Sequence, residues 1–201
     1  GSEAIDRAIR FLESMRSPTD GPGGLPDPVT DADYQPRDKA KETLGRFLFF
    51  DKVLSGNMNM SCATCHHPLA ATSDGLSLPV GEGGIGLATT RNTGDGAGAV
   101  PERVPRNSPH IYNLGALEFE VMFHDGRLAV DPTQPSGYLT PAGDDFPMGL
   151  ESALAAQAMF PVTSREEMRG PGGNPGGAAA ADGLATIWSA LIERLMAVPR
   201  S

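Results

Sequence analysis

Residues 62–66 read Cys-Ala-Thr-Cys-His, and this C-x-x-C-H spacing is the one that attaches haem covalently in c-type cytochromes. Two thiols three positions apart can add to the two vinyl groups of one haem, and the histidine beside the second thiol then reaches the iron as its proximal ligand. Cys62 and Cys65 are the only cysteines in the chain. A disulfide or half of a zinc site is the alternative, but the other histidines lack the H-x₃₋₅-H spacing of a zinc site. We therefore predict one covalent haem c, held by Cys62, Cys65 and His66.

Composition and charge narrow the classes of partner. The chain has 201 residues, enough for one domain or for one domain and part of another. A net charge of −9 argues against nucleic acid or an anionic membrane as a partner. No apolar run approaches the ~18 residues of a membrane helix. Because covalent haem attachment implies export, we expect a periplasmic protein whose signal peptide has been removed.

The helices that must position this site can be predicted from apolar residues at helical spacing. This spacing predicts helices at residues 3–15, 37–49, 149–160 and 184–195. Glycine and proline, 25 and 18 of the 201 residues, gather between these helices, so we expect long irregular loops there. We find no internal repeat and no convincing strand. The expected fold is therefore mainly α, a cytochrome c-type haem domain with long irregular loops.

The same patterns divide the chain into three parts. Residues 1–36 form an N-terminal helix and a Pro/Gly-rich arm, residues 37–170 form the haem domain, and residues 171–201 form a low-complexity linker and a C-terminal helix. Residues 68–109 show little periodicity and much glycine, which predicts a long loop. Loops of this length are uncommon unless functional, so we expect this loop to surround the haem. Residues 81–86 fit the G-x-G-x-x-G pattern of dinucleotide sites, but no helix follows them. These glycines more simply let the backbone turn sharply or pass close to the haem.

Four short stretches follow one another in the order found in a known family. They are Leu44–Asp51 with Leu54-Ser55-Gly56 and the C-x-x-C-H motif, then Arg106–Pro109 with Asn113, then Phe123–Arg127, then Gln157, Pro161 and Glu167-Met168. Together they resemble the N-terminal haem domain of the bacterial dihaem cytochrome c peroxidases, a family that includes the MauG-type enzymes. The resemblance covers roughly residues 40–170 and is far more specific than C-x-x-C-H alone.

This resemblance implies that the haem is the one that meets hydrogen peroxide. On its distal side the family carries a glutamine, a proline and a glutamate, which correspond to Gln157, Pro161 and Glu167. Splitting the O–O bond needs a base that moves a proton from the near oxygen to the leaving oxygen, and a carboxylate in an apolar pocket can do this. Without the resemblance, Glu167 is simply an exposed acid and Gln157 a residue of a helix surface. The family also binds calcium between its haem domains, which implies Asn107 as one calcium ligand.

The chain departs from the family pattern at three places. Members with a histidine on the glycine loop use it to cap the resting iron, but here that position is Glu82, which we interpret as a solvated loop acid beside an open or water-ligated iron. The tryptophan before Asp-Gly-Arg is replaced by His124, which is then an electron relay, a hydrogen-bond partner or a packed side chain. The only tryptophan, Trp188, lies on an apolar helix face and should belong to the core. A second C-x-x-C-H is missing, so either the chain is incomplete relative to the family, with its second haem on another segment or chain, or it is a one-haem variant.

We therefore predict a periplasmic c-haem oxidoreductase that reacts with H₂O₂. It either reduces peroxide with electrons from a small redox protein or carries out MauG-type oxidation of a partner protein. The alternative is a monohaem electron-transfer cytochrome c, in which a methionine such as Met148 or Met159 is the second axial ligand of the iron.

Overall fold

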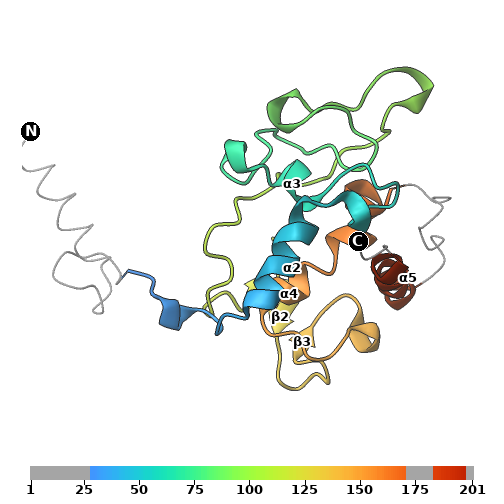
Figure 1. Cartoon of the computed structure of the whole chain (residues 1–201). Coiled ribbons are helices and arrows are strands. Elements are labelled where there is room, and N and C mark those ends of the chain that lie inside the picture. Colours follow the sequence, from blue (N-terminus) through green and yellow to red (C-terminus); the bar gives the residue numbers. More distant parts are fainter. Residues whose placement is uncertain (1–27, 171–182, 198–201) are drawn as a thin grey trace, which may run out of the picture. The chain divides into compact units, whose positions relative to one another are not determined.

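The structure is a computed structural model that describes residues 28–170 and 183–197 (Figure 1). The chain divides into two compact units, residues 1–34 and residues 35–201. In the first unit, Asp31–Asp33 form a single 3₁₀ turn. The helix predicted at residues 3–15 and the low-complexity stretch beyond Gly170 lie outside the described residues. No helix within the described ranges has both the length and the apolar character needed to cross a bilayer.

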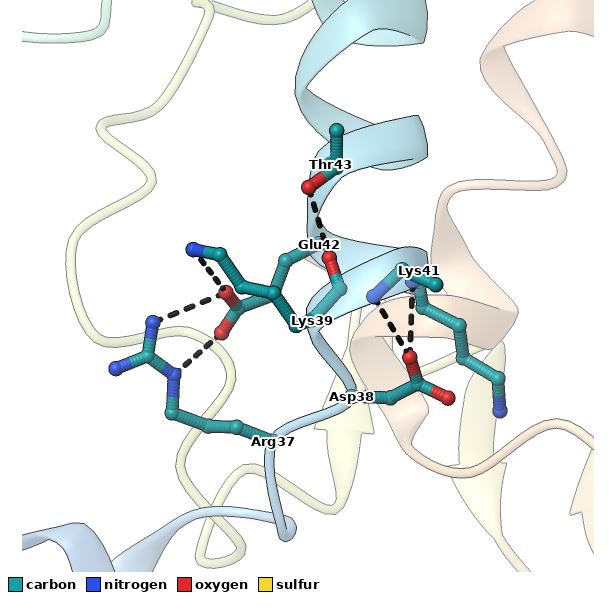
Figure 2. Close-up of polar contacts among 7 residues, drawn as sticks. Arg37, Asp38, Lys39, Lys41, Glu42 and Thr43 are labelled. Carbon is teal, nitrogen blue, oxygen red and sulfur yellow. Dashed lines mark hydrogen bonds and ion pairs between the residues drawn. The ribbon is translucent and has the colours of Figure 1, made fainter.

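The first helix of the second unit is α2 (Lys39–Phe50), which confirms the helix predicted at residues 37–49. Asp38 is its N-cap, and its Oδ1 accepts the backbone N–H groups of Ala40 at 2.9 Å and Lys41 at 3.1 Å (Figure 2). These bonds satisfy two of the N–H groups that every helix start leaves without a partner in the helix. Figure 2 also shows the ion pairs on the exposed first turn, which join Glu42 to Arg37 and Lys39.

After the short helix α3 (Cys62–Cys65), the chain runs to residue 120 without a strand or a further α-helix, as the glycine content predicted. Only three single 3₁₀ turns interrupt this loop, which is mostly green in Figure 1: Pro68–Ala70, Ala88–Thr90 and Gly96–Gly98. The buried guanidinium of Arg91 donates to the carbonyls of Val80 at 2.6 Å, Gly81 at 2.6 Å and Gly86 at 3.0 Å. Because buried carbonyls need partners, one arginine replaces the hydrogen bonds that a helix or sheet would have provided.

A small antiparallel sheet corrects the prediction that the chain has no strand. Its order is β1 (Val121–Met122), β2 (Leu128–Val130) and β3 (Tyr138–Leu139), with Met122 opposite Leu128 and Ala129 opposite Leu139. Each strand has only two or three residues, too few to show the period-two alternation that identifies a strand in a sequence.

The remaining elements are α4 (Ala153–Gln157), a 3₁₀ turn (Pro161–Thr163), a π-helical turn (Arg165–Arg169) and α5 (Leu184–Ala197). Helix α4 is much shorter than the predicted residues 149–160. It begins only after its N-cap Ser152, whose side chain accepts from the N–H of Ala155, and it ends early because Pro161 has no N–H to donate to the carbonyl four residues earlier. Helix α5 agrees with the predicted C-terminal helix. Figure 1 shows α4 beside β2, and the two elements are in contact.

An apolar core joins the sheet to α4 and α5. Aromatic rings form its centre: Phe146 stacks on Phe160 with ring centroids 5.7 Å apart, and Trp188 meets both rings edge to face. The indole N–H of Trp188 donates to the carbonyl of Met159 at 2.8 Å, so its one polar atom is satisfied. Trp188 is only 6% exposed, which confirms its assignment to the core.

Candidate functional site

Helix α3 places the two cysteines of the C-x-x-C-H motif one turn apart. The N–H of Ser61 donates to Oγ1 of Thr64 at 2.9 Å, which closes the first turn of this very short helix. Both thiols are free and partly buried. Burial raises the pKa of Cys62, and it raises the pKa of Cys65 to about 12. Both groups are therefore neutral thiols at neutral pH.

The half-zinc-site alternative requires further ligands beside the two thiols. Among residues 28–170 and 183–197, no group of three or more His, Cys, Asp or Glu side chains is arranged to hold a metal ion. The two thiols thus lack the further ligands that a zinc site requires.

His66 follows α3, and its ring is held by the long loop. Its Nδ1 lies 3.1 Å from the carbonyl oxygens of both Thr72 and Pro109, and 3.3 Å from Oγ of Ser108. Carbonyl oxygens only accept hydrogen bonds, so Nδ1 carries the proton and Nε2 presents its lone pair. A neutral imidazole with Nδ1–H bound to a carbonyl is the usual form of a metal-ligating histidine. The donor set of two adjacent thiols and one oriented imidazole therefore fits a covalent haem.

The Arg106–Pro109 motif contributes to this orientation. Oγ of Ser108 donates to the carbonyl of Cys65 at 2.7 Å, and the carbonyl of Ser108 accepts from Oγ of Ser73 at 2.8 Å. These bonds tie two loop segments to the end of α3. The neighbouring Asn107 is exposed, and its Nδ2 donates to the carbonyl of Leu76 at 2.5 Å. That bond engages the amide nitrogen of Asn107, so the atom suited to calcium is its Oδ1.

Glu167 lies on the π-helical turn, a rare conformation that is frequent at functional sites. Burial raises the pKa of Glu167, the positive charge of Arg127 lowers it, and Glu166 raises it. The charge of Glu167 in turn contributes to the raised pKa of Cys65, so the carboxylate lies within electrostatic range of the attachment thiols. A half-buried acid with a raised pKa is suited to proton transfer.

The other two predicted distal residues lie on the segments just before Glu167. Gln157 is the last residue of α4, and Pro161 opens the 3₁₀ turn that packs against the π-helical turn. Both side chains are half-buried. The structure therefore brings Pro161 and Glu167 onto adjoining turns, with Gln157 one segment earlier.

His124 occupies the turn between β1 and β2. Its side chain is exposed in this chain. The guanidinium of Arg127, in the same turn, lies 3.9 Å from the ring centroid of Phe123 and 3.0 Å from Oδ2 of Asp125. Of the two methionines considered as axial ligands, Met148 is 76% exposed and Met159 is half-buried.

The prediction that Glu82 is a solvated loop acid is wrong, because its side chain is buried. It is only 6% exposed, and its Oε1 accepts from Nδ2 of Asn57 at 2.5 Å and from Nδ2 of Asn59 at 2.8 Å. These partners lie more than twenty positions away in the chain, so no local pattern identifies them. The only local signal was the glycines that flank Glu82, which indicate a close approach of backbones rather than an open loop.

Comparisons with known proteins show which sequences and structures this chain is similar to. A sequence model described as di-haem cytochrome c peroxidase matches residues 39–200. The methylamine utilization protein MauG of Methylorubrum extorquens is 31% identical over 164 residues, which are 81% of this chain and 33% of that protein. The cytochrome c551 peroxidase of Pseudomonas aeruginosa is 32% identical over 103 residues, which are 51% of this chain and 24% of that protein.

One solved structure, described as a MauG-like protein associated with microbial copper homeostasis, aligns with 90% of this chain and 36% of that chain. Its sequence identity is 23% and the TM-score is 0.44. The chain thus spans a third or less of the length of the curated relatives described above, at 33% and 24%.

Proposed function

Because this chain belongs to the di-haem cytochrome c peroxidase family, we propose that it is the peroxide-reacting haem domain of a periplasmic c-type haem oxidoreductase. The observation that carries the proposal is the orientation of His66 beside two free thiols. Its Nδ1 lies 3.1 Å from two backbone carbonyl oxygens, so Nε2 is the nitrogen that would bind the haem iron. The raised pKa of Glu167 supports the peroxide reaction rather than electron transfer alone.

The residues then have separate tasks. Haem, when bound, would supply the redox chemistry for splitting the O–O bond. Cys62 and Cys65 would hold it through thioether bonds, and the hydrogen bonds at Nδ1 would make His66 a more basic ligand. Glu167 accepts the proton of the near peroxide oxygen and returns it to the far oxygen, which leaves as water. Gln157 positions peroxide and Pro161 forms part of the distal wall.

Two reaction classes follow from this chemistry. In the first, H₂O₂ takes up two electrons from a small redox protein and two protons, and gives two molecules of water. In the second, the two electrons come from a partner protein that is thereby oxidised, as in MauG-type enzymes. We further propose that the second haem of the family resides on another segment or chain, and that Oδ1 of Asn107 is one ligand of a calcium ion.

The test uses the haem-loaded protein produced by export into a bacterial periplasm. We expect a mass increased by one haem, a high-spin ferric spectrum, and a rapid change of the haem band when peroxide is mixed in a stopped-flow instrument. Two results together would identify an electron-transfer cytochrome instead. The spectrum would be the low-spin spectrum of methionine–histidine ligation, and peroxide would leave the haem band unchanged even when a second haem domain is present.

A further inference from the structure

Three segments that are distant in sequence meet at one buried carboxylate. Glu82 accepts hydrogen bonds from Asn57 and Asn59, and its own backbone N–H donates to the carbonyl of Glu167 at 2.7 Å. Close by, the N–H of Gly56 donates to the carbonyl of Met168 at 2.8 Å. The segment that carries the proposed acid–base residue is therefore tied to the loop of Glu82 and to the turn that precedes α3. We call the group of Asn57, Asn59, Glu82 and Gly170 the Glu82 junction.

Two glycines allow the close approach at and beside this junction: Gly81 lies against the backbone of the π-helical turn, and Gly170 lies against the carboxylate of Glu82. A Cβ on Gly81 would lie 1.9 Å from the carbonyl oxygen of Glu166, and a Cβ on Gly170 would lie 2.3 Å from Oε2 of Glu82. Any side chain at Gly81 would push the loop away from the π-helical turn. A side chain at Gly170 would displace the carboxylate from its place. The three segments can therefore pack in this way only while Gly81 and Gly170 carry no side chain.

A carboxylate is a costly group to bury for packing alone. Removing an ionised group from water is unfavourable unless hydrogen bonds and nearby charge compensate. The two asparagine amides supply the hydrogen bonds. The nearby buried guanidinium of Arg91 supplies positive charge: burial lowers the pKa of Arg91, while the charge of Glu82 acts to raise it. An apolar side chain would fill the same space without these requirements, but it could not join three segments directionally.

We infer that Glu82 is a positioning residue for Glu167, and that it acts by fixing the π-helical turn against the glycine loop. The inference rests on the acid–base role proposed for Glu167. A general base must lie within hydrogen-bond distance of the proton that it removes. A displacement of about 1 Å can slow such a reaction by about 10²-fold, so a residue that never touches peroxide can still control the rate.

The experiment measures the second-order rate constant of the ferric haem with H₂O₂ by stopped flow. Glu82→Ala removes the acceptor and should slow the reaction by about 10–100-fold. Glu82→Gln keeps an oxygen for the two asparagine amides and should restore most of the rate. The Asn57→Ala/Asn59→Ala double variant should show a smaller loss in the same direction. Because both asparagines are exposed, this variant also tests the inference if Glu82→Ala does not fold.

A double-mutant cycle distinguishes positioning from a general structural role. If Glu82 acts through Glu167, then Glu82→Ala should add little to the loss already caused by Glu167→Gln. A matched control is Glu102→Ala, because Glu102 is an exposed acid that pairs with Arg165 of the same π-helical turn at 3.6 Å and is not part of the junction. This control should react at the parent rate.

The possible failures differ from one another. If Glu167→Gln is slow but the Glu82 and asparagine variants react like the parent, the positioning inference is wrong and the proposed function stands. Fully additive losses also overturn the inference, since they show that Glu82 affects the rate independently of Glu167. If Glu167→Gln itself reacts like the parent, both the acid–base role and the inference are wrong.

Discussion

The buried side chains of residues 55–108 include many polar groups, whereas those described within residues 122–170 and 183–191 are apolar. All buried polar or charged residues within the described ranges lie in the first stretch: Ser55, Ser61, Thr64, Ser73, Asp74, Glu82, Arg91 and Ser108. The second stretch supplies every buried member of the apolar core except Met60. We call these stretches the polar region and the apolar region.

The two regions are stabilised by different kinds of interaction, hydrogen bonds in the polar region and apolar packing in the apolar region. Hydrogen bonds are directional, so the polar region can fix an irregular backbone and orient single groups such as the imidazole of His66. Apolar packing is not directional, and its stabilisation grows with the buried area. We therefore expect substitutions at polar contacts to misplace groups and change reactivity, and substitutions of the buried apolar side chains in the apolar region to lower stability while leaving reactivity intact.

The largest effect is expected for Glu167, which lies on the π-helical turn packed against the polar region. Glu167→Gln keeps the size of the side chain but removes the proton acceptor. General acid–base catalysis contributes about 10²–10⁴-fold, so the rate constant with H₂O₂ should fall by that factor. The exposed acid Glu102, which pairs with Arg165 of the same turn at 3.6 Å, provides the control. Glu102→Gln should keep the parent rate and the parent spectrum, and equal losses in both variants would contradict the assignment.

The pH dependence of the same rate has a definite sign. Burial raises the pKa of Glu167, so its active, deprotonated form is lost as the pH falls through this raised pKa, and the rate should fall with it. Stability has the opposite dependence, because a group whose pKa is raised by folding favours the folded state most at low pH and loses that contribution as the pH rises. The Gln variant should therefore lack the acid limb of the rate profile and be no less stable than the parent at neutral pH. An acid limb that survives in this variant would assign the titration to another group.

The next effect tests the apolar region. Leu128 on β2 is completely buried, so Leu128→Ala should lower the free energy of unfolding by about 2–5 kcal/mol through lost contacts and a new cavity. Leu139 on the paired strand β3 is 50% exposed, and Leu139→Ala should change the free energy of unfolding by only about 0.5 kcal/mol or less. Denaturant unfolding of the haem-loaded protein measures the effect of both substitutions. The peroxide rate of folded Leu128→Ala should equal that of the parent, and a lost rate would show that the two regions are not separable.

A smaller effect is expected where a polar side chain holds the loop. Arg91→Lys keeps the charge, but an ammonium group cannot reach the three carbonyls of Val80, Gly81 and Gly86 together. Each buried carbonyl left without a partner costs about 1–3 kcal/mol, and exposure of the loop to water will relieve part of this cost. Amide hydrogen exchange should therefore become faster in residues 80–86 and stay unchanged in α5. Uniform acceleration throughout the chain would mean that the loop does not open by itself.

Prediction from the sequence succeeded where the signal was local. The pattern of apolar residues was sufficient for α2, for α5 and for the burial of Trp188. It failed for the strands, which are too short to alternate, and for the end of α4, where Pro161 removes a hydrogen bond. It also failed for Glu82, because the burial of a loop acid depends on distant partners. The assigned roles of Gln157, Pro161 and Glu167 came from the family resemblance, and they stay predictions until the variants are measured.

The smallest effect is expected for Asp38. Its side chain hydrogen-bonds backbone groups at the start of a helix, as the side chain of Arg91 does within a loop. Its carboxylate satisfies two backbone N–H groups of α2, but these groups are exposed, so water can replace the lost partner. Asp38→Ala should therefore lower the free energy of unfolding by only about 0.5–2 kcal/mol, as for other N-caps. Lys41→Ala is the control, since it removes only an exposed ion pair with Glu151 and should change the unfolding midpoint less than Asp38→Ala does. If Asp38→Ala proves as costly as Arg91→Lys, then burial is not what makes the polar contacts of the loop important. The distinction between a solvated and a buried hydrogen-bonding group would have to be abandoned for this protein.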